Sequence, residues 1–212
     1  MNILALDTHD RKFNFWLTYS GREYSFQGTG QSELIALYLR QLFDSYGINA
    51  GNFDLFIGIK GPGSFTGLRS GFALLSGLCL GDLSKLRLVP TFRAYEQKAQ
   101  IAGWKRFMAV LPAGLGDCFL CEGYGDQGRL VDICQLESAC SDAEGYLGAR
   151  TAALDARGLC YLSDRMLSPV AASLVSHDGS SFCDLAIDYC KLPGITISKK
   201  HRARAACVSS SS

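Results

Sequence analysis

The chain has 212 residues, of which 48% are hydrophobic and 19% are charged, and its formal net charge is +1. A chain of this length and apolar content can bury a substantial core, which excludes intrinsic disorder for the body of the protein. The near-neutral charge argues against a stand-alone, non-specific nucleic-acid binder, because such a protein needs a basic excess to displace counterions.

The charge is unevenly distributed along the chain. Residues 191–212 contain five basic side chains and no acidic one: Lys191, Lys199, Lys200, Arg202 and Arg204. Residues 1–190 then hold 16 basic and 20 acidic side chains, a net charge of −4. A short charged terminus is usually solvated, but the basic residues leave a contact with RNA open.

The N-terminal residues predict a cytosolic protein. Met1–Asp7 has no positively charged start, and its apolar run is too short for a signal peptide. No stretch approaches the ~20 uninterrupted apolar residues of a membrane span. In a reducing cytosol the nine cysteines are most simply free and buried.

Hydrophobic periodicity predicts an α/β chain with two similar halves. In the first half it indicates a buried strand at 2–7, a hairpin of strands at 12–19 and 22–28, a helix from Gln31 or Ser32 to Tyr46, a buried strand at 53–59 and a helix at 65–81. The second half indicates strands at 107–111, 118–124, 129–136 and 159–162, and helices at 138–154, 167–176 and 180–190. We place the boundary between the halves near Leu83–Trp104.

The most specific segment is Lys60-Gly-Pro-Gly-Ser-Phe-Thr-Gly-Leu-Arg69, which joins a predicted strand to a predicted helix. Backbone N–H groups and the helix dipole can hold an anion at such a junction. The segment lacks the Gly-Lys-Ser/Thr of a Walker loop and the third glycine of G-x-G-x-x-G. Two interpretations stay open: an anion site, or a tight turn in which Ser64 or Thr66 caps the helix.

Asp7 and Thr8, at the end of the first strand, also allow two interpretations. The Asp7 carboxylate faces a phosphate or a metal, or the two residues cap the end of the strand. The candidate nucleotide-binding residues are therefore Asp7, Thr8, Gly61, Gly63, Ser64 and Thr66.

The helix predicted at 65–81 carries one charged residue, Arg69. An apolar stripe covers one side (Phe65, Leu68, Phe72, Leu75 and Cys79), and small residues lie roughly opposite (Ser70, Ala73, Gly77 and Gly81). Gly71 and Gly77 each cost about 0.5–1 kcal/mol relative to alanine in a helix interior. We therefore expect another element to approach this helix closely, either a partner helix or the protein's own core.

The helix predicted at 31–46 spreads its apolar side chains over about 180°, where one core face needs only about 100°. These are Leu34, Ile35, Tyr38, Leu39, Leu42, Phe43 and Tyr46. Together the two helices predict a protein–protein surface.

Other catalytic and metal-binding patterns are weak. Cys118 and Cys121 lie in a strand-like run, where residues three apart point to opposite faces, and no second pair at zinc spacing follows. Cys134 and Cys140 have no histidine near them, and His9, His177 and His201 are scattered. We therefore expect no metal site and no catalytic residue, and a hydrolase is unsupported.

The opening Ile3-Leu-Ala-Leu-Asp-Thr8 and the segment Gly61–Arg69, followed by a helix ending Gly77-Leu-Cys-Leu-Gly81, resemble the TsaB (YeaZ) family over residues 1–100. The resemblance implies two RNase-H-like lobes of the actin/Hsp70/sugar-kinase (ASKHA) type, with a degenerate second lobe. The lobes would span 1–100 and 101–190, before a basic tail at 191–212.

The resemblance also implies a role. Members are non-catalytic partners of TsaD in making N6-threonylcarbamoyladenosine in tRNAs that read ANN codons, and TsaD carries the metal and the transfer chemistry. TsaB pairs with TsaD or with itself through its first two helices. The implied interface residues are Leu34, Tyr38, Leu42, Arg69, Ser70, Ala73, Gly77 and Gly81. TsaE is a further candidate partner, tRNA is reached indirectly, and ATP or ADP would bind only in the complex.

The chain departs from the family pattern at three places. The usual His-Ser-Glu start of the first helix is Gln31-Ser32-Glu33 here. The segment Asp-Ala-Arg-x-Gly-Glu-Val-Tyr corresponds to 112–119 and lacks the Asp and the Arg, and the closing Pro-x-Tyr-x-Arg is not evident at 193–199. The alternative function is a nucleotide-dependent kinase or ATPase that uses Asp7 and the 61–66 loop. It would need a second phosphate loop with an acidic residue, for which 112–117 offers only Asp117.

Overall fold

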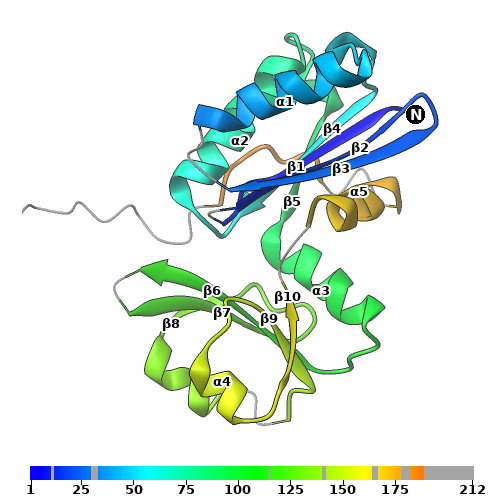
Figure 1. Cartoon of the computed structure of the whole chain (residues 1–212). Coiled ribbons are helices and arrows are strands. Elements are labelled where there is room, and N and C mark those ends of the chain that lie inside the picture. Colours follow the sequence, from blue (N-terminus) through cyan, green and yellow to red (C-terminus); the bar gives the residue numbers. More distant parts are fainter. Residues whose placement is uncertain are drawn as a thin grey trace, which may run out of the picture.

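Two five-stranded sheets, one from each half of the chain, form the framework of the computed structural model (Figure 1). The structure describes residues 1–10, 12–29, 33–114, 116–139, 142–163, 167–177 and 182–188. The predicted starting residues Gln31 and Ser32, the residues Cys140 and His201, and the basic tail lie outside this range. None of the described helices has the length and apolar character to cross a membrane.

The first sheet contains β1 (Ile3–Asp7), β2 (Lys12–Tyr19), β3 (Arg22–Thr29), β4 (Leu55–Gly61) and β5 (Leu86–Pro90), in the order β3-β2-β1-β4-β5. The first three strands pair antiparallel, whereas β4 pairs parallel with both β1 and β5. The predicted hairpin and the two predicted buried strands are confirmed.

The second sheet repeats this topology. It contains β6 (Phe107–Gly114), β7 (Asp117–Glu122), β8 (Arg129–Asp132), β9 (Gly145–Gly148) and β10 (Cys160–Ser163), in the order β10-β9-β6-β7-β8. When each sheet is counted from its own first strand, the strand orders and pairing directions are identical. The prediction of two similar α/β lobes is confirmed.

The helices differ between the halves. The first half has α1 (Glu33–Tyr46), α2 (Phe65–Leu78) and α3 (Thr91–Ile101). At the corresponding places the second half has a 3-10 helix (Ile133–Glu137), α4 (Ala152–Ala156) and α5 (Leu167–His177). The helices in the first two connections thus shorten from 14 residues each to five each. In this sense the second lobe is degenerate. Single turns of 3-10 helix also occur at Ala50–Asn52 and Leu83–Lys85.

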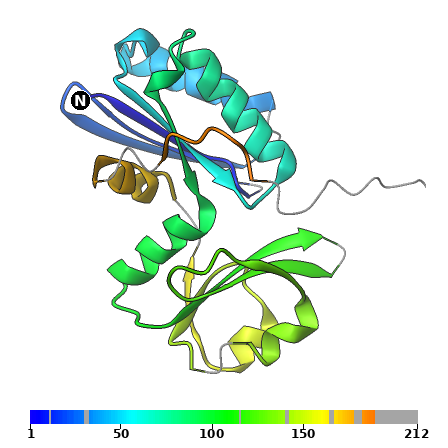
Figure 2. The same ribbon diagram turned by 180° about the vertical axis from the view of Figure 1, so that it is seen from behind.

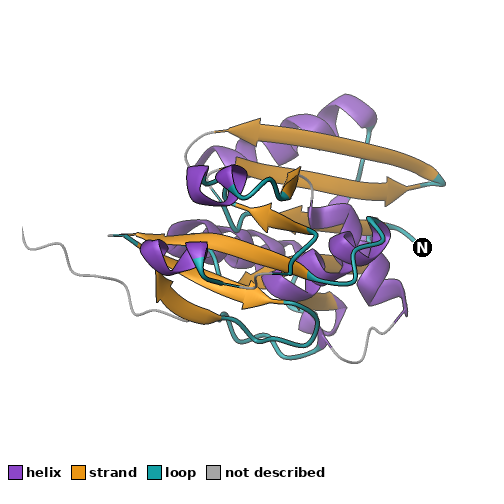
Figure 3. Cartoon of the chain, turned by 90° about the horizontal axis from the view of Figure 1, so that it is seen from below, coloured by secondary structure: helices purple, strands orange, loops and turns teal. Residues whose placement is uncertain are grey.

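The core is continuous between the two halves. Helices α1 and α2 cover one face of the first sheet, whereas α3 and α5 lie between that sheet's other face and the second sheet (Figures 1 and 2). Helix α5 follows the second sheet in the sequence but packs against β1 and β4 of the first. Figure 3 shows the resulting layers of strands and helices from below.

At three places the structure differs from the predicted elements. The stretch at 83–104, to which we assigned no element, holds β5 and α3, whose Val89 and Tyr95 are fully buried. The signal for β5 was weak because the strand is short, contains Arg87 and ends at Pro90. The helix predicted at 138–154 is replaced by β9 and α4.

The third difference is at 180–190, where we predicted a helix. That prediction is wrong, because residues 183–188 have no helical structure. In addition, α2 ends at Leu78 rather than at residue 81. Leu80 and Gly81 adopt positive φ angles of 51° and 90°, and such left-handed residues end a helix.

Candidate functional site

The glycine-rich segment forms a capped turn between β4 and α2. The Ser64 hydroxyl oxygen accepts a hydrogen bond from the backbone N–H of Gly67 (3.3 Å), and the Ser64 N–H donates to the carbonyl oxygen of His9 (2.6 Å). The segment therefore has the N-capping serine that one of the two interpretations predicts.

Three glycines bring the start of α2 directly against the turn that follows β1. A Cβ atom added to Gly63 would lie 2.5 Å from the carbonyl oxygen of His9, and one added to Gly67 would lie 2.1 Å from that of Thr8. A Cβ atom at Gly71 would lie 2.4 Å from the Thr8 hydroxyl. The close approach expected at Gly71 is thus made by the protein's own first strand.

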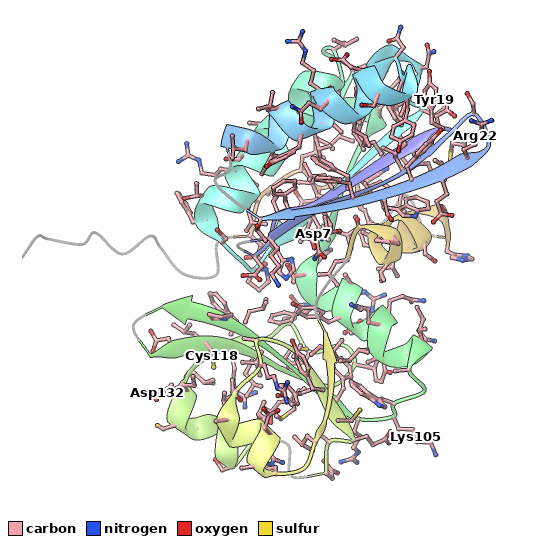
Figure 4. The ribbon with its side chains drawn as sticks, in the orientation of Figure 1. Asp7, Tyr19, Arg22, Lys105, Cys118 and Asp132 are labelled. Atoms are coloured by element: carbon pink, nitrogen blue, oxygen red, sulfur yellow. The ribbon has the colours of Figure 1, made fainter. Side chains whose placement is uncertain are left out.

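Asp7, at the end of β1, is buried and fully engaged within the chain (Figure 4). One carboxylate oxygen accepts hydrogen bonds from the backbone N–H of His9 (3.0 Å) and pairs with its Nδ1 (2.6 Å), and the other accepts from the Asn14 side chain (3.0 Å). Burial on its own would raise the pKa of Asp7, but the charge and hydrogen bonds of His9, together with Asn14, lower it below its usual value.

The polar chain continues from Asp7 into both helices that lie between the lobes. The Nε2 atom of His9 lies 3.0 Å from the hydroxyl of Tyr95 on α3. On the other side, the side-chain amide oxygen Oδ1 of Asn14 accepts a hydrogen bond from the hydroxyl of Ser168 on α5 (2.5 Å). All five side chains are buried. This network links β1 and β2 to α3 and α5, and a buried polar network is favourable when its members are satisfied.

The structure brings together only part of the predicted nucleotide site. Gly63 and Ser64 contact His9, which is hydrogen-bonded to Asp7, and Thr8 lies against Gly67 and Gly71. Gly61 lies against the backbone of Asp188, and Thr66 is exposed on the outer side of α2. The geometry supports a structural junction more directly than a phosphate site.

The outer side of α2 is open to solvent. Arg69, Ala73, Gly77 and Gly81 are exposed, and Ser70 is half-buried. A Cβ atom added to Gly77 or Gly81 would meet nothing within 4 Å. Gly77 therefore carries the helix-destabilising cost of glycine without a close neighbour among the described residues.

A groove of about 580 Å³ runs along the same side of α2. We call it the α2 groove and define it by its lining residues: Phe65, Thr66, Arg69, Ser70, Phe72, Ala73 and Ile187. Three of the predicted interface residues, Arg69, Ser70 and Ala73, line it.

The predicted interface residues of α1 are distributed differently. Tyr38 packs inside the lobe, with its ring centroid 5.6 Å from those of Phe13 and Phe26. Leu42 is also half-buried against this core, whereas Leu34 is exposed. The strands of the hairpin therefore cover part of the apolar side chains of α1 that we assigned to a partner, whereas Leu34, Leu37 and Tyr46 stay exposed.

The cysteines of the C-x-x-C lie on opposite faces of β7, as predicted. Cys118 packs in the core on the outer face of the second sheet, and Cys121 in the core between the lobes. Burial raises the pKa of both thiols. Within the described ranges, no group of three His, Cys, Asp or Glu side chains could hold a metal ion.

This arrangement predicts selective alkylation. Under native conditions N-ethylmaleimide should modify the exposed Cys134, Cys160 and Cys183, because the reaction needs an accessible thiolate. Cys79, Cys118 and Cys121 are buried and should react only after unfolding. Peptide mapping by mass spectrometry would test this, and rapid native modification of Cys121 would contradict it.

Sequence reasoning missed most of the buried network. The spacing Asp7-x-His9 at the end of a strand was the available signal, since it lets an imidazole fold back onto the carboxylate. Tyr95 and Ser168 gave no such signal, because they are distant in the sequence from their partners. Tyr95 lies 86 positions after His9, and Ser168 lies 154 positions after Asn14.

The chain is similar in fold to solved structures, two of which are described here. YeaZ from Pseudomonas aeruginosa matches with a TM-score of 0.64 and 19% identity, over 89% of this chain and 99% of that one. An uncharacterized protein described as similar to peptidase YeaZ from P. aeruginosa matches with a TM-score of 0.64 and 21% identity, over 90% and 99%. No protein-family model and no curated protein sequence matches the chain. The chain therefore has the fold of the YeaZ structures along nearly their whole length, as the resemblance of its first 100 residues implied.

Proposed function

We propose that this protein is a TsaB-type, non-catalytic subunit that pairs with TsaD in the formation of N6-threonylcarbamoyladenosine in ANN-reading tRNAs. Two independent findings support the proposal: the family-like segments at 3–8 and 61–81, and the shared fold with YeaZ. The observation that carries it is the exposed small-residue face of α2, centred on Ala73 and Gly77.

This face suits close helix packing. Small side chains let a second helix approach until backbones and neighbouring side chains are in contact. Gly77 has open space beyond it, so a helix docked there would supply the contacts that the described part of the chain does not. That gain would offset the cost of an interior glycine.

A scaffold role also agrees with the hydrogen bonds that Asp7 accepts from its own chain. A carboxylate that accepts three hydrogen bonds from its own chain has little capacity left for a metal–nucleotide complex. In the proposed complex TsaD supplies the metal and the transfer chemistry, and any ATP or ADP binds only there. Isothermal titration of the isolated protein with ATP and Mg²⁺ tests the rival nucleotide-dependent enzyme, which micromolar binding would favour.

Replacing Gly77 with leucine should abolish pairing and leave the fold intact. The new side chain would point into solvent in the isolated protein, where Gly77 has no neighbour within 4 Å of an added Cβ, but would collide with a partner helix. Ala73→Trp, also at an exposed position, should act in the same way. Size-exclusion chromatography with TsaD would measure the loss.

The matched control is Ala152→Leu, which also replaces a small residue by leucine, at an exposed position of α4, and should leave the complex unchanged. Circular dichroism must show that Gly77→Leu is folded. Unchanged co-elution of Gly77→Leu with TsaD would refute the proposed pairing face.

The same face would serve pairing with TsaD or with a second copy. TsaE would join through the complex, tRNA would be reached indirectly, and the setting is the cytosol. The assignments of partners and tRNA rest on the family resemblance, and the cytosolic setting rests on the N-terminal residues Met1–Asp7.

A further inference from the structure

The last described residues of the chain return to α2. We call Phe182–Asp188 the clasp; Figure 2 shows it as the orange segment that runs beside α2. Phe182 is buried in the core between the lobes. The N–H of Asp188 donates to the carbonyl oxygen of Lys60 (2.8 Å), and the Lys60 ammonium pairs with Asp184 (2.8 Å). The clasp is therefore fixed at both ends.

Ile187 of the clasp forms one wall of the α2 groove. It is half-buried and faces the same space as Phe65 and Phe72 of α2. A segment more than 100 residues away in the sequence thus shapes the surface that we assign to pairing. A helix seated on α2 in this groove would contact Ile187 as well.

The described lining of the groove has one sign of charge. Arg69 is the only charged residue among the described residues that line it, and its guanidinium lies over the Phe65 ring, 5.3 Å from the centroid. No salt bridge joins Arg69 to another of the described residues. Charge complementarity therefore favours an acidic partner.

We propose that the α2 groove, with Ile187 as its second wall, receives a partner helix that has an apolar face and a carboxylate opposite Arg69. This inference rests on the proposed function and names the chemistry of the partner surface. The α2 helix of a second copy fits less well, because its only charged residue is Arg69 and it would offer no acidic side chain. The clasp is then part of the recognition surface, and TsaD is the partner to test.

Isothermal titration of the full chain with purified TsaD tests the groove. Ile187→Ser removes the apolar wall and should weaken binding about tenfold, whereas Ala186→Ser, at the exposed neighbouring position, should not. Arg69→Glu should weaken binding by about tenfold or more at low salt, and by less at high salt. The matched charge reversal is Arg22→Glu, at an exposed position of β3, and it should leave the affinity unchanged.

Gly77→Leu, measured in parallel, separates this inference from the proposed function. If Gly77→Leu abolishes binding but Ile187→Ser and Arg69→Glu bind like the wild type, the groove proposal is wrong and the pairing face stands. If Gly77→Leu binds like the wild type, the pairing face itself is wrong. Stronger binding by Arg69→Glu, or a wild-type protein that pairs only with itself, would overturn the acidic-partner proposal.

Discussion

Replacing Asp7 with alanine should lower the free energy of unfolding by about 3–5 kcal/mol, the usual cost of removing one partner of a buried ionic pair. The substitution leaves the His9 ring and the Asn14 amide buried without their acceptor, and unsatisfied buried groups are expensive. Because the network reaches Tyr95 and Ser168, the packing of α3 and α5 should loosen as well. Urea-induced unfolding followed by circular dichroism would measure the loss.

The matched control is Asp44→Asn on α1. Asp44 pairs with Arg40 at 3.7 Å, and its side chain is 73% exposed, so its loss should cost less than about 1 kcal/mol. If Asp7→Ala destabilised the protein no more than this control, the network would not be a structural link between the lobes.

The cost of Asp7→Ala should depend on pH in a defined direction. Folding lowers the pKa of Asp7 below the unfolded value of 3.8, so the ionised carboxylate stabilises the fold above that pH. The stabilisation is lost as the pH falls through the folded pKa. The difference between wild type and variant should therefore be full near neutral pH and shrink below about pH 4. A difference that grew on acidification would contradict this assignment.

Glycine-to-alanine substitutions within the single helix α2 should have opposite effects at two positions. Gly77→Ala should stabilise the isolated protein by up to about 0.5–1 kcal/mol, because an exposed glycine in the last turn of α2 is replaced by the best helix former. Gly67→Ala should destabilise it by about 1–3 kcal/mol through overpacking, because the new methyl would overlap the carbonyl oxygen of Thr8.

Thermal unfolding of both variants under identical conditions would test this pair. The helix propensity gained is the same at both positions, so the difference between them isolates the steric contact at Gly67. Equal shifts in Tm would mean that α2 does not lie directly on the turn after β1.

Much of the first lobe could be predicted because its elements carry strong local signals. The alternation on both sides of Ser20-Gly21 marked the hairpin, and the apolar stripe from Leu68 to Cys79 marked the buried side of α2. The strand β5 was missed because it is short and contains Arg87. The helix α3 was missed because part of its burial comes from contacts with α5 and β6 of the second half of the chain, and because it contains the charged residue Glu96, which is buried. The tertiary environment overrode the local pattern there.

The candidate site divides in the same way. The exposed small-residue face of α2 could be predicted, because helical geometry alone places Ala73 and Gly77 opposite Leu75. The role of Tyr38 could not, since its burial depends on how the hairpin strands curve over α1. The clasp gave no signal in the sequence, because its position beside Lys60 is set by α5 and the core between the lobes.

Hydrogen–deuterium exchange of the full chain, with and without TsaD, tests whether this protein pairs through α2. We expect TsaD to slow exchange in Phe65–Leu78 and at Ile187, and to leave the outer face of the second lobe, around α4 and β8, unchanged. Protection confined to the second lobe, or no protection of α2 in a complex that forms, would contradict pairing through α2.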